Sequence, residues 1–466
     1  HPRVRRQRQM CIRDRLEFLR DVLSQPALLI GIMSCVGLIA LKRPFHKIMT
    51  GTLKPILGYL MLAAGAGVIV SNLDPLGKMI EHGFHITGVV PNNEAIVAVA
   101  QKVLGVETMS ILVVGLLMNL LIARFTKFKY VFLTGHHSLF MACLMSAVLG
   151  TAGLSGIELI LVGGFLMGAW SAISPAIGQS YTSKVTDGDE IALGHFGSLG
   201  YYLSAWVAKY VGKAEESTED IEIPEKWGFL RDSTLSTALT MIVFYLIAAI
   251  AAGSEFVATL SGSMSPYLFA VMSAMNFAVG VAIVYSGVRM ILGDLIPAFQ
   301  GIATKIIPNA IPAVDCAVFF TYAPTAVVLG FISSFIGGII GMLILGAVGG
   351  VLIIPGLVPH FFCGATAGIY GNATGGRRGA AVGAFLNGLA ITFLPALALP
   401  VLGQLGFQNT TFGDADFAVM GLVLGNAFEW IGMAGIYGVV VIAALVLIIP
   451  NFIKTKGKVI NYVEEE

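Results

Sequence analysis

The residues best suited to chemistry in this sequence are a few ionisable side chains inside long apolar stretches. Asp315 lies in NAIPAVDCAVFFTY, after a proline break and with no cation nearby in the sequence. An ionisable group inside a membrane span costs roughly 2.5–3.5 kcal/mol on insertion scales, so each one is a functional candidate. We expect Asp315 to handle substrate or protons. The alternative is an aspartate that only caps a half-helix.

Histidines in two glycine-containing segments are the next candidates. His136 and His137 lie in LTGHHSLF, and His195 lies in GHFG. An imidazole can donate and accept hydrogen bonds at once, which suits a polyhydroxylated ring. A neighbouring glycine lets the backbone approach a solute. His136 and His195 are therefore expected to bind substrate, with a helix–helix hydrogen bond as the alternative for each.

Glycine-rich turns offer a weaker kind of site. Thr87 and Gly88 lie in HITGVV, and residues 364–366 and 370–372 form similar short motifs. Their backbone amides can face a solute, but tight turns explain them equally simply, and we favour turns. The sequence contains no Walker A, Gly-x-Ser-x-Gly or His-Glu-x-x-His motif, which argues against an ATP-driven pump or a membrane hydrolase.

The composition predicts that membrane helices position these residues. The chain has 466 residues, of which 56% are hydrophobic and only 12% charged, whereas roughly 25% charge is usual in soluble proteins. The net charge of +1, with no basic stripe, gives no reason to expect nucleic acid as a partner. The five cysteines are scattered without CxxC spacing, so neither a disulfide framework nor a zinc site is expected.

Apolar spans and broken apolar segments alternate along the chain. Spans are predicted at residues 27–41, 56–70, 109–122, 132–149, 157–173, 236–252, 267–286, 325–349, 380–402 and 431–450. Segments 74–105, 191–211, 291–321 and 353–372 are apolar but interrupted by glycine, proline and polar residues. Non-helical backbone survives at membrane depth only where protein or a water-filled cavity satisfies it. The broken segments are therefore predicted to be re-entrant hairpins or broken helices that line a site.

The chain divides into two membrane halves around an acidic loop. A faint similarity of residues 51–75 to residues 286–309 favours a repeat, with chance similarity between glycine-rich membrane helices as the alternative. Lysines and arginines at 42–47, 124–129 and 454–458 place those regions in the cytoplasm. The expected organisation is a non-native leader at 1–15, with a basic arm as the alternative, a first membrane repeat at 16–212, an acidic linker at 213–230, a second repeat at 231–450 and a cytoplasmic tail at 451–466.

Several separate segments together resemble one family. TGTLKPILGYLMLAAGAGVI, LTGHHSLF, KVTDGDEIALGHFGS, GKAEESTEDIEIP, GVRMILGDLIPAFQGIATKIIPNAIPAVDCAVFFTYAPTAVVLGF and VLIIPGLVPHFFCGATAGIYGN are similar to the ascorbate-specific IIC component family of the bacterial phosphotransferase system. The resemblance runs from about Leu16 to the C-terminus. It implies an all-α polytopic membrane protein of about eleven transmembrane helices with re-entrant hairpins and inverted repeats. It also implies a substrate-binding core, and a V-shaped scaffold that forms a homodimer.

The function that the resemblance implies is group translocation across the bacterial inner membrane. Family members carry L-ascorbate by an elevator-like movement. They pass it to a cytoplasmic IIB protein, which receives its phosphoryl group from IIA and whose phosphocysteine converts the solute to L-ascorbate 6-phosphate. The membrane subunit is not itself phosphorylated, and neither a cofactor nor a metal is implied.

The resemblance also implies specific substrate contacts. Relatives carry glutamines where this chain has Ser138-Leu139-Phe140 and Phe196-Gly197, which bears on the exact substrate because amide donors fix a sugar-acid ring. Asp315 is expected either to accept a proton during phosphoryl transfer or to hold ring hydroxyls, and we favour holding. The contacts carried over by motif are Thr87, Gly88, His136, His137, Ser138, Leu139, Phe140, His195, Phe196 and Asp315.

Two other functions stay open from the residues alone. An ion-coupled secondary transporter would use Asp315 and the histidines as a proton relay. A membrane receptor would bind a sugar acid without moving it, but the many broken helices argue against a receptor.

Overall fold

The computed structural model describes residues 22, 25–85, 88–91, 93–188, 191–221, 233–403 and 410–452. The expected leader at 1–15, Thr87, the later part of the acidic linker and most of the C-terminal tail lie outside these residues.

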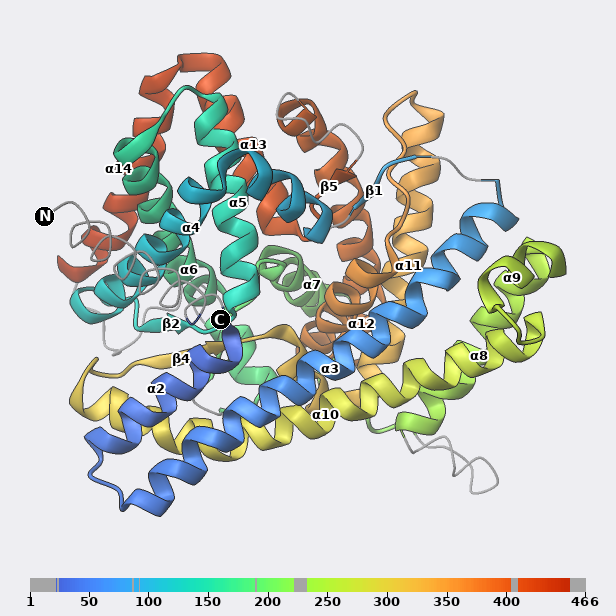
Figure 1. Cartoon of the computed structure of the whole chain (residues 1–466), viewed down its shortest axis with the longest axis horizontal. Helices are drawn as coiled ribbons and strands as arrows, with labels where there is room; N and C mark the ends of the chain where they lie inside the picture. Colours follow the sequence, from blue (N-terminus) through green and yellow to red (C-terminus); the bar gives the residue numbers. More distant parts are fainter. Residues whose placement is uncertain are drawn as a thin grey trace, which may run out of the picture.

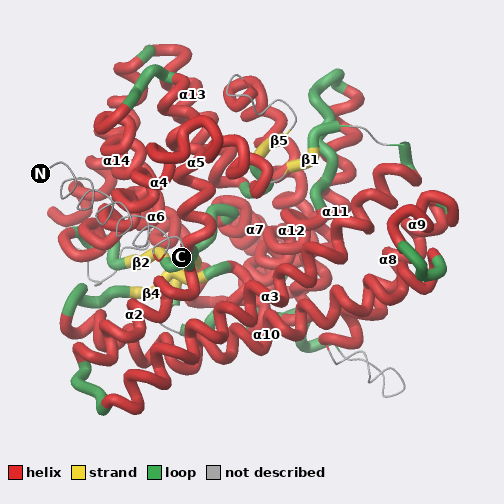
Figure 2. The backbone as a smooth tube through the Cα atoms, viewed as in Figure 1, coloured by secondary structure: helices red, strands yellow, loops and turns green. Residues whose placement is uncertain are grey.

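Helices dominate the described chain (Figures 1 and 2). They are α2 (Pro26–Ala40), α3 (Phe45–Gly83), α4 (Asn93–Phe125), α5 (Gly135–Thr151), α6 (Gly156–Val185), α7 (Ser198–Val211), α8 (Ser233–Ala252), α9 (Ser254–Ser261), α10 (Pro266–Lys305), η2 (Cys316–Thr321), α11 (Pro324–Ala347), α12 (Leu357–Gly403), α13 (Ala415–Ile431), α14 (Met433–Ile448) and η3 (Ile449–Phe452). Short strands interrupt them: β1 (Val90–Pro91), β2 (Tyr130–Phe132), β3 (Ala192–Leu193), β4 (Ile311–Val314) and β5 (Thr410–Thr411).

Seven helices of the described chain are long and apolar enough to cross a membrane. The count becomes eight if α8 and α9, which are bent by 117° at their junction, form one broken span. The expectation of a polytopic helical membrane protein is confirmed at this level, while the count of about eleven stays a prediction. The spans are Phe45–Gly83, Val106–Phe125, Gly156–Val185, Pro266–Ile291, Pro324–Ala347, Leu357–Pro400 and Met433–Phe452.

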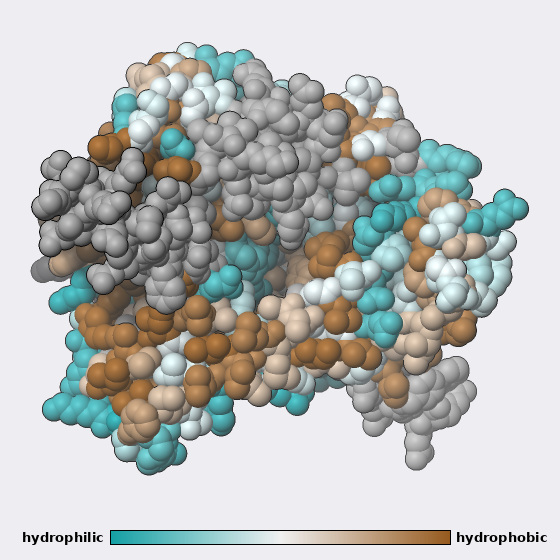
Figure 3. Space-filling model, in the orientation of Figure 1, coloured by the Kyte–Doolittle hydropathy of each residue, from teal (hydrophilic) through white to brown (hydrophobic). Residues whose placement is uncertain are grey.

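The long helices α3 and α10 lie side by side along one edge of the molecule (Figure 1). Their backbones meet at glycines: a Cβ built on Gly58 would lie 2.8 Å from the carbonyl oxygen of Gly287, and one on Gly65 would lie 2.7 Å from that of Gly280. Small residues at helix crossings allow this approach in membranes. Brown, hydrophobic residues gather over the middle of the band formed by α2, α3 and α10, while teal, hydrophilic residues lie toward its ends, as expected of helices that cross a membrane (Figure 3).

The short strands form two small parallel sets that mix the two halves of the chain. In the first set, β4 of the second half lies between β2 and β3 of the first half. In the other, the segment around β1 pairs with β5 and, through Val89, with Ile353 of the second half. The strands thus satisfy part of the non-helical backbone in the broken segments, which a membrane interior demands. An all-helical expectation omitted these strands.

The described start of the acidic linker is bound to the helices rather than free. The side-chain oxygen of Asn372 accepts a hydrogen bond from Thr218 N (2.8 Å), and the Arg377 amide donates to Glu216 O (2.8 Å). One carboxylate oxygen of Glu219 accepts from the amides of Thr325 (3.0 Å) and Ala326 (3.1 Å). Glu219 therefore caps the N-terminus of α11, where a negative charge also meets the positive end of the helix dipole.

We expect Glu219→Ala to lower Tm by about 1–3 °C, because two amides of the first turn of α11 lose their acceptor. Thermal unfolding of the purified protein in detergent, followed by fluorescence, measures the shift. Glu215→Ala, which removes an exposed glutamate of the same segment, is the matched control. An equal shift in both variants would contradict the capping role.

Candidate functional site

The first strand set brings the predicted site residues together. His136 and His137 follow β2, His195 follows β3, and Asp315 follows β4. Because these strands are parallel and adjacent, their carboxyl ends share one edge, and the segments that leave them start side by side. His136, His137, His195 and Asp315 thus reach one place although the segments that carry them are 58 to 179 positions apart in the sequence. Ligand sites form at such strand ends in other parallel sheets.

His136 and Asp315 form the more accessible pair. His136 Nε2 lies 3.4 Å from Asp315 Oδ2, and His136 Nδ1 lies 3.1 Å from the hydroxyl of Tyr59. The other oxygen of Asp315, Oδ1, accepts from the Ala317 amide at 3.0 Å and so caps η2. Asp315 therefore caps a short helix with one oxygen and faces an imidazole with the other, and its handling of substrate or protons stays a prediction. The His136 side chain is 39% exposed, so the pair is reachable by solute.

His137 and His195 form a second, buried pair. Their ring centroids are 3.7 Å apart, and their exposed fractions are 3% and 4%. The ring of Phe417 stacks on His137 with 12° between the planes, and Phe196 stacks on Phe132 behind it. Aromatic packing on this scale holds the imidazoles in one orientation.

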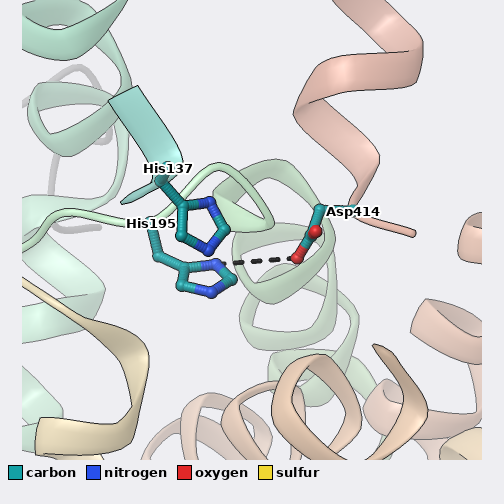
Figure 4. Close-up of side chains that lie close together, drawn as sticks. All are labelled: His137, His195 and Asp414. Atoms are coloured by element: carbon teal, nitrogen blue, oxygen red, sulfur yellow. Dashed lines mark ion pairs between the residues drawn. The ribbon is translucent and has the colours of Figure 1, made fainter. Parts of the chain in front are cut away.

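Asp414 completes this buried group (Figure 4). Its Oδ1 lies 3.9 Å from His195 Nδ1 and accepts a hydrogen bond from Cys363 Sγ at 2.9 Å. Its Oδ2 accepts from Asn93 Nδ2 at 2.6 Å. The carboxylate is 5% exposed. Through these two hydrogen bonds Asp414, at the start of α13, connects that helix to α4 and α12 beside the histidines.

These groups line a cavity of about 1370 Å³. His136, His137, Phe140, His195 and Asp315 line it together with Asp414. Elsewhere its walls are largely apolar and come from α3, α8, α11 and α12, and Figure 3 shows the surface hollowed above α3. A largely apolar cavity with a few convergent polar groups is the usual form of a small-molecule site.

Two clusters have the composition of a metal site. His137, His195 and Asp414 offer ligand atoms within 4.8 Å of one another, as do His195, Asp315 and Cys316. However, Gly197 N donates to His195 Nδ1 (3.1 Å), and Phe196 N donates to His137 Nδ1 (3.4 Å). A backbone N–H only donates, so each Nδ1 carries a lone pair and each neutral ring carries its proton on Nε2. Both histidines are thus arranged as N–H donors to a ligand oxygen rather than as metal ligands.

Other residues predicted to contact substrate lie around this group without lining the cavity. Ser138 is buried and its hydroxyl donates to Thr134 O, while Leu139 packs into the neighbouring apolar cluster. Phe196 is fully buried behind His137. Gly88 lies in the second strand set, where a Cβ would lie 2.6 Å from Leu352 O. Contacts from these residues to substrate stay predictions.

The sequence reasoning missed Asp414, Asn93, Cys363 and Tyr59 as members of the site. Asp414 lies in GDADFAVM, an apolar segment that carries two acidic residues. The rule that selected Asp315, an ionisable group inside an apolar segment, applies there as well and would have found it. Nothing in the sequence around Tyr59, Asn93 or Cys363 signals their place, which depends on how α3, α4 and α12 pack.

Comparison with known proteins places this site in context. Residues 21–416 match the family described as PTS system sugar-specific permease component (EIIC-GAT). The chain is also 26% identical over 417 residues to a protein of Mycoplasma pneumoniae (strain ATCC 29342 / M129 / Subtype 1) named "Ascorbate-specific PTS system EIIC component". That similarity covers 76% of this chain and 62% of the relative. The chain thus spans less than two thirds of the length of the curated relative that it matches.

Proposed function

Because this chain belongs to the family of sugar-specific permease components of the phosphotransferase system, we propose that it carries L-ascorbate across the bacterial inner membrane for phosphorylation to L-ascorbate 6-phosphate. In this proposal a separate cytoplasmic IIB protein, recharged by IIA, supplies the phosphoryl group from a phosphocysteine. The P–S bond breaks, a P–O bond to the substrate hydroxyl forms, and the hydroxyl proton leaves. The substrate assignment draws on the name of the Mycoplasma pneumoniae relative.

The observation that carries the proposal is the convergence of three histidines and Asp315 on one cavity. Among the described lining residues, Lys78 is the only lysine or arginine, and it pairs with Asp74 at 2.8 Å. The polar lining near the strand ends therefore combines uncharged groups, such as the imidazoles and the Tyr59 hydroxyl, with the carboxylates of Asp315 and Asp414. Neutral donors beside carboxylate acceptors match a ring that carries several hydroxyls and carbonyl oxygens.

Asp315 is proposed to hold ring hydroxyls rather than to take a proton in the transfer step. Its Oδ2 faces His136 at the cavity while Oδ1 is engaged by the Ala317 amide. A carboxylate fixed in this way accepts hydrogen bonds from a diol, and charged acceptors make the stronger hydrogen bonds. The proposal also includes a homodimer and an elevator-like movement of the histidine-bearing core, which follow from the resemblance.

An ion-coupled carrier is the second candidate. It draws on the buried position of Asp414 beside His195 and of Asp315 beside His136, because carboxylate–histidine pairs at membrane depth form proton relays in transporters. A sugar acid would then be accumulated unmodified at the expense of a proton gradient.

Uptake by membrane vesicles separates the two candidates. We expect vesicles bearing this chain to convert radiolabelled L-ascorbate to its 6-phosphate only when phosphorylated IIB is present, and to do so in the presence of an uncoupler. His136→Ala should lose this activity, whereas His46→Ala, which alters an exposed histidine that does not line the cavity, should retain it. Accumulation of unmodified L-ascorbate without IIB, and loss of that accumulation when the uncoupler is added, would favour the ion-coupled carrier. No activity either with or without IIB would contradict the substrate assignment.

A further inference from the structure

Asp416 is a fully buried carboxylate for which the proposed function has no use. It lies in the first turn of α13 with no exposed surface. Its Oδ1 accepts from the Leu199 amide (2.9 Å), and its Oδ2 accepts from the Ser198 hydroxyl (2.7 Å) and from Trp170 Nε1 (3.1 Å). Its own amide donates to the carbonyl oxygen of Phe196 (2.9 Å). Three of these four hydrogen bonds therefore reach the turn 196–199, directly after His195.

His195 Nδ1 has two neighbours, the amide of Gly197 in this turn and the hydroxyl of Tyr201 at 2.9 Å. The hydroxyl can donate or accept, so the amide is the neighbour that excludes a proton on Nδ1. The Gly197 amide, between the residues that Asp416 holds, donates to His195 Nδ1 at 3.1 Å. Gly197 fits tightly: an added Cβ would lie 2.3 Å from the Tyr201 hydroxyl and 3.2 Å from His195 Nδ1. Since the amide can only donate, Nδ1 must accept, and Nε2–H is the donor available to a ligand.

We propose that Asp416 is a positioning residue for the substrate site. By holding both sides of Gly197, it keeps the amide on His195 Nδ1 and so maintains the neutral ring with its proton on Nε2. The inference rests on the proposed function, in which His195 donates to a substrate oxygen. The hydrogen bond made by one ring nitrogen of a histidine sets which nitrogen carries the proton, and Asp416 acts on that bond through the Gly197 turn.

The alternative is that Asp416 only stabilises the packing of α6, α7 and α13. This alternative can be tested because one hydrogen-bond partner of Asp416, Trp170, lies on α6 and outside the turn 196–199. Trp170→Phe removes one hydrogen bond of Asp416 but none within residues 196–199. Ser198→Ala removes a bond within the turn and leaves the Asp416 side chain in place, so it serves if Asp416→Asn fails to fold.

The test has a ligand-free part. The full chain is labelled with ¹³C and ¹⁵N histidine in detergent, and the His195 signals are identified by their loss in His195→Gln. We expect the Nε2–H form in the wild type and in Trp170→Phe, and a mixture of tautomers in Asp416→Asn and Ser198→Ala. An unchanged Nε2–H signal in folded Asp416→Asn, or in Ser198→Ala where Asp416→Asn does not fold, would overturn the proposal.

A binding cycle tests the same proposal through substrate. We expect Asp416→Asn, or Ser198→Ala in its place, to weaken L-ascorbate binding by about 10-fold. In the His195→Gln background the same change should add less than about 2-fold, because it acts through His195. Equal effects in both backgrounds would overturn the positioning role. Absence of L-ascorbate binding in the wild type would instead refute the proposed substrate, and the tautomer measurement would still decide the role of Asp416.

Discussion

Asp315→Asn is expected to abolish L-ascorbate uptake while leaving the fold intact. The amide oxygen of asparagine can still accept from the Ala317 N–H, so the cap of η2 remains. The negative charge that faces His136 at 3.4 Å and the cavity is lost. Hydrogen bonds to charged groups contribute about 1.5–3 kcal/mol, so binding should weaken by about 10–150-fold if Asp315 holds the ring hydroxyls.

Binding and transfer must be measured separately for this variant. If Asp315 instead accepts the hydroxyl proton, binding should persist while phosphorylation falls by about 10²–10⁴-fold. Binding of radiolabelled L-ascorbate to the purified variant distinguishes the two roles, and persistent binding would refute the holding role that we favour. Asp294→Asn is the matched control, because Asp294 lies on α10, pairs with Lys54 of α3 and does not line the cavity. Full uptake by Asp315→Asn would exclude both roles.

Gly280→Val is expected to cause the largest loss of stability. A Cβ at this position would lie 2.9 Å from the carbonyl oxygen of Gly65 and 3.0 Å from the amide nitrogen of Ile69. These are backbone atoms of α3, which cannot rotate away as a side chain can. Overpacking of this kind costs about 1–3 kcal/mol, and we expect the upper end because two helix backbones must separate.

The stability loss is measured as Tm and as the yield of monodisperse protein in detergent. Gly293→Val is the matched control on the same helix, since a Cβ at Gly293 would meet no atom of another described element within 4 Å. Valine there removes a glycine from a helix and should leave Tm unchanged or slightly raised. A Tm for Gly280→Val equal to that of Gly293→Val would show that the close crossing of α3 and α10 contributes nothing.

Hydropathy located the apolar spans well but not their ends. The span predicted at 236–252 ends at the last residue of α8, whereas the one at 157–173 corresponds to α6, which runs on to Val185. Ser174, Gln179 and Thr182 in that extension are polar yet buried. Hydropathy reports how well a side chain suits contact with lipid, whereas these three side chains contact protein. Their polarity therefore does not indicate where the helix ends.

The main residues of the candidate site could be predicted from the sequence, but the residues and strand pairings that bring them together could not. Asp315 follows from the cost of an ionisable group in an apolar segment. His136 and His195 follow from imidazoles beside glycines, and the resemblance adds His137. Their convergence depends on β4 pairing with β2 and β3, strands of two to four residues that are far apart in sequence. Strands so short have no periodicity to detect. The same cost applies to Asp414 and Asp416 in GDADFAVM, but which residues they hold depends on how α6, α7, α12 and α13 pack.

The exchange of strands between the two halves has a consequence for how the chain matures. β2 and β3 are synthesised well before β4, so the edge that each of them offers to β4 has no partner while only the first half exists. The second set is likewise incomplete until the segment around Ile353 and then β5 have been made. Neither half can therefore mature as an independent unit. The site closes late in biogenesis, and the unpaired backbone must stay shielded until the ribosome has passed residue 411.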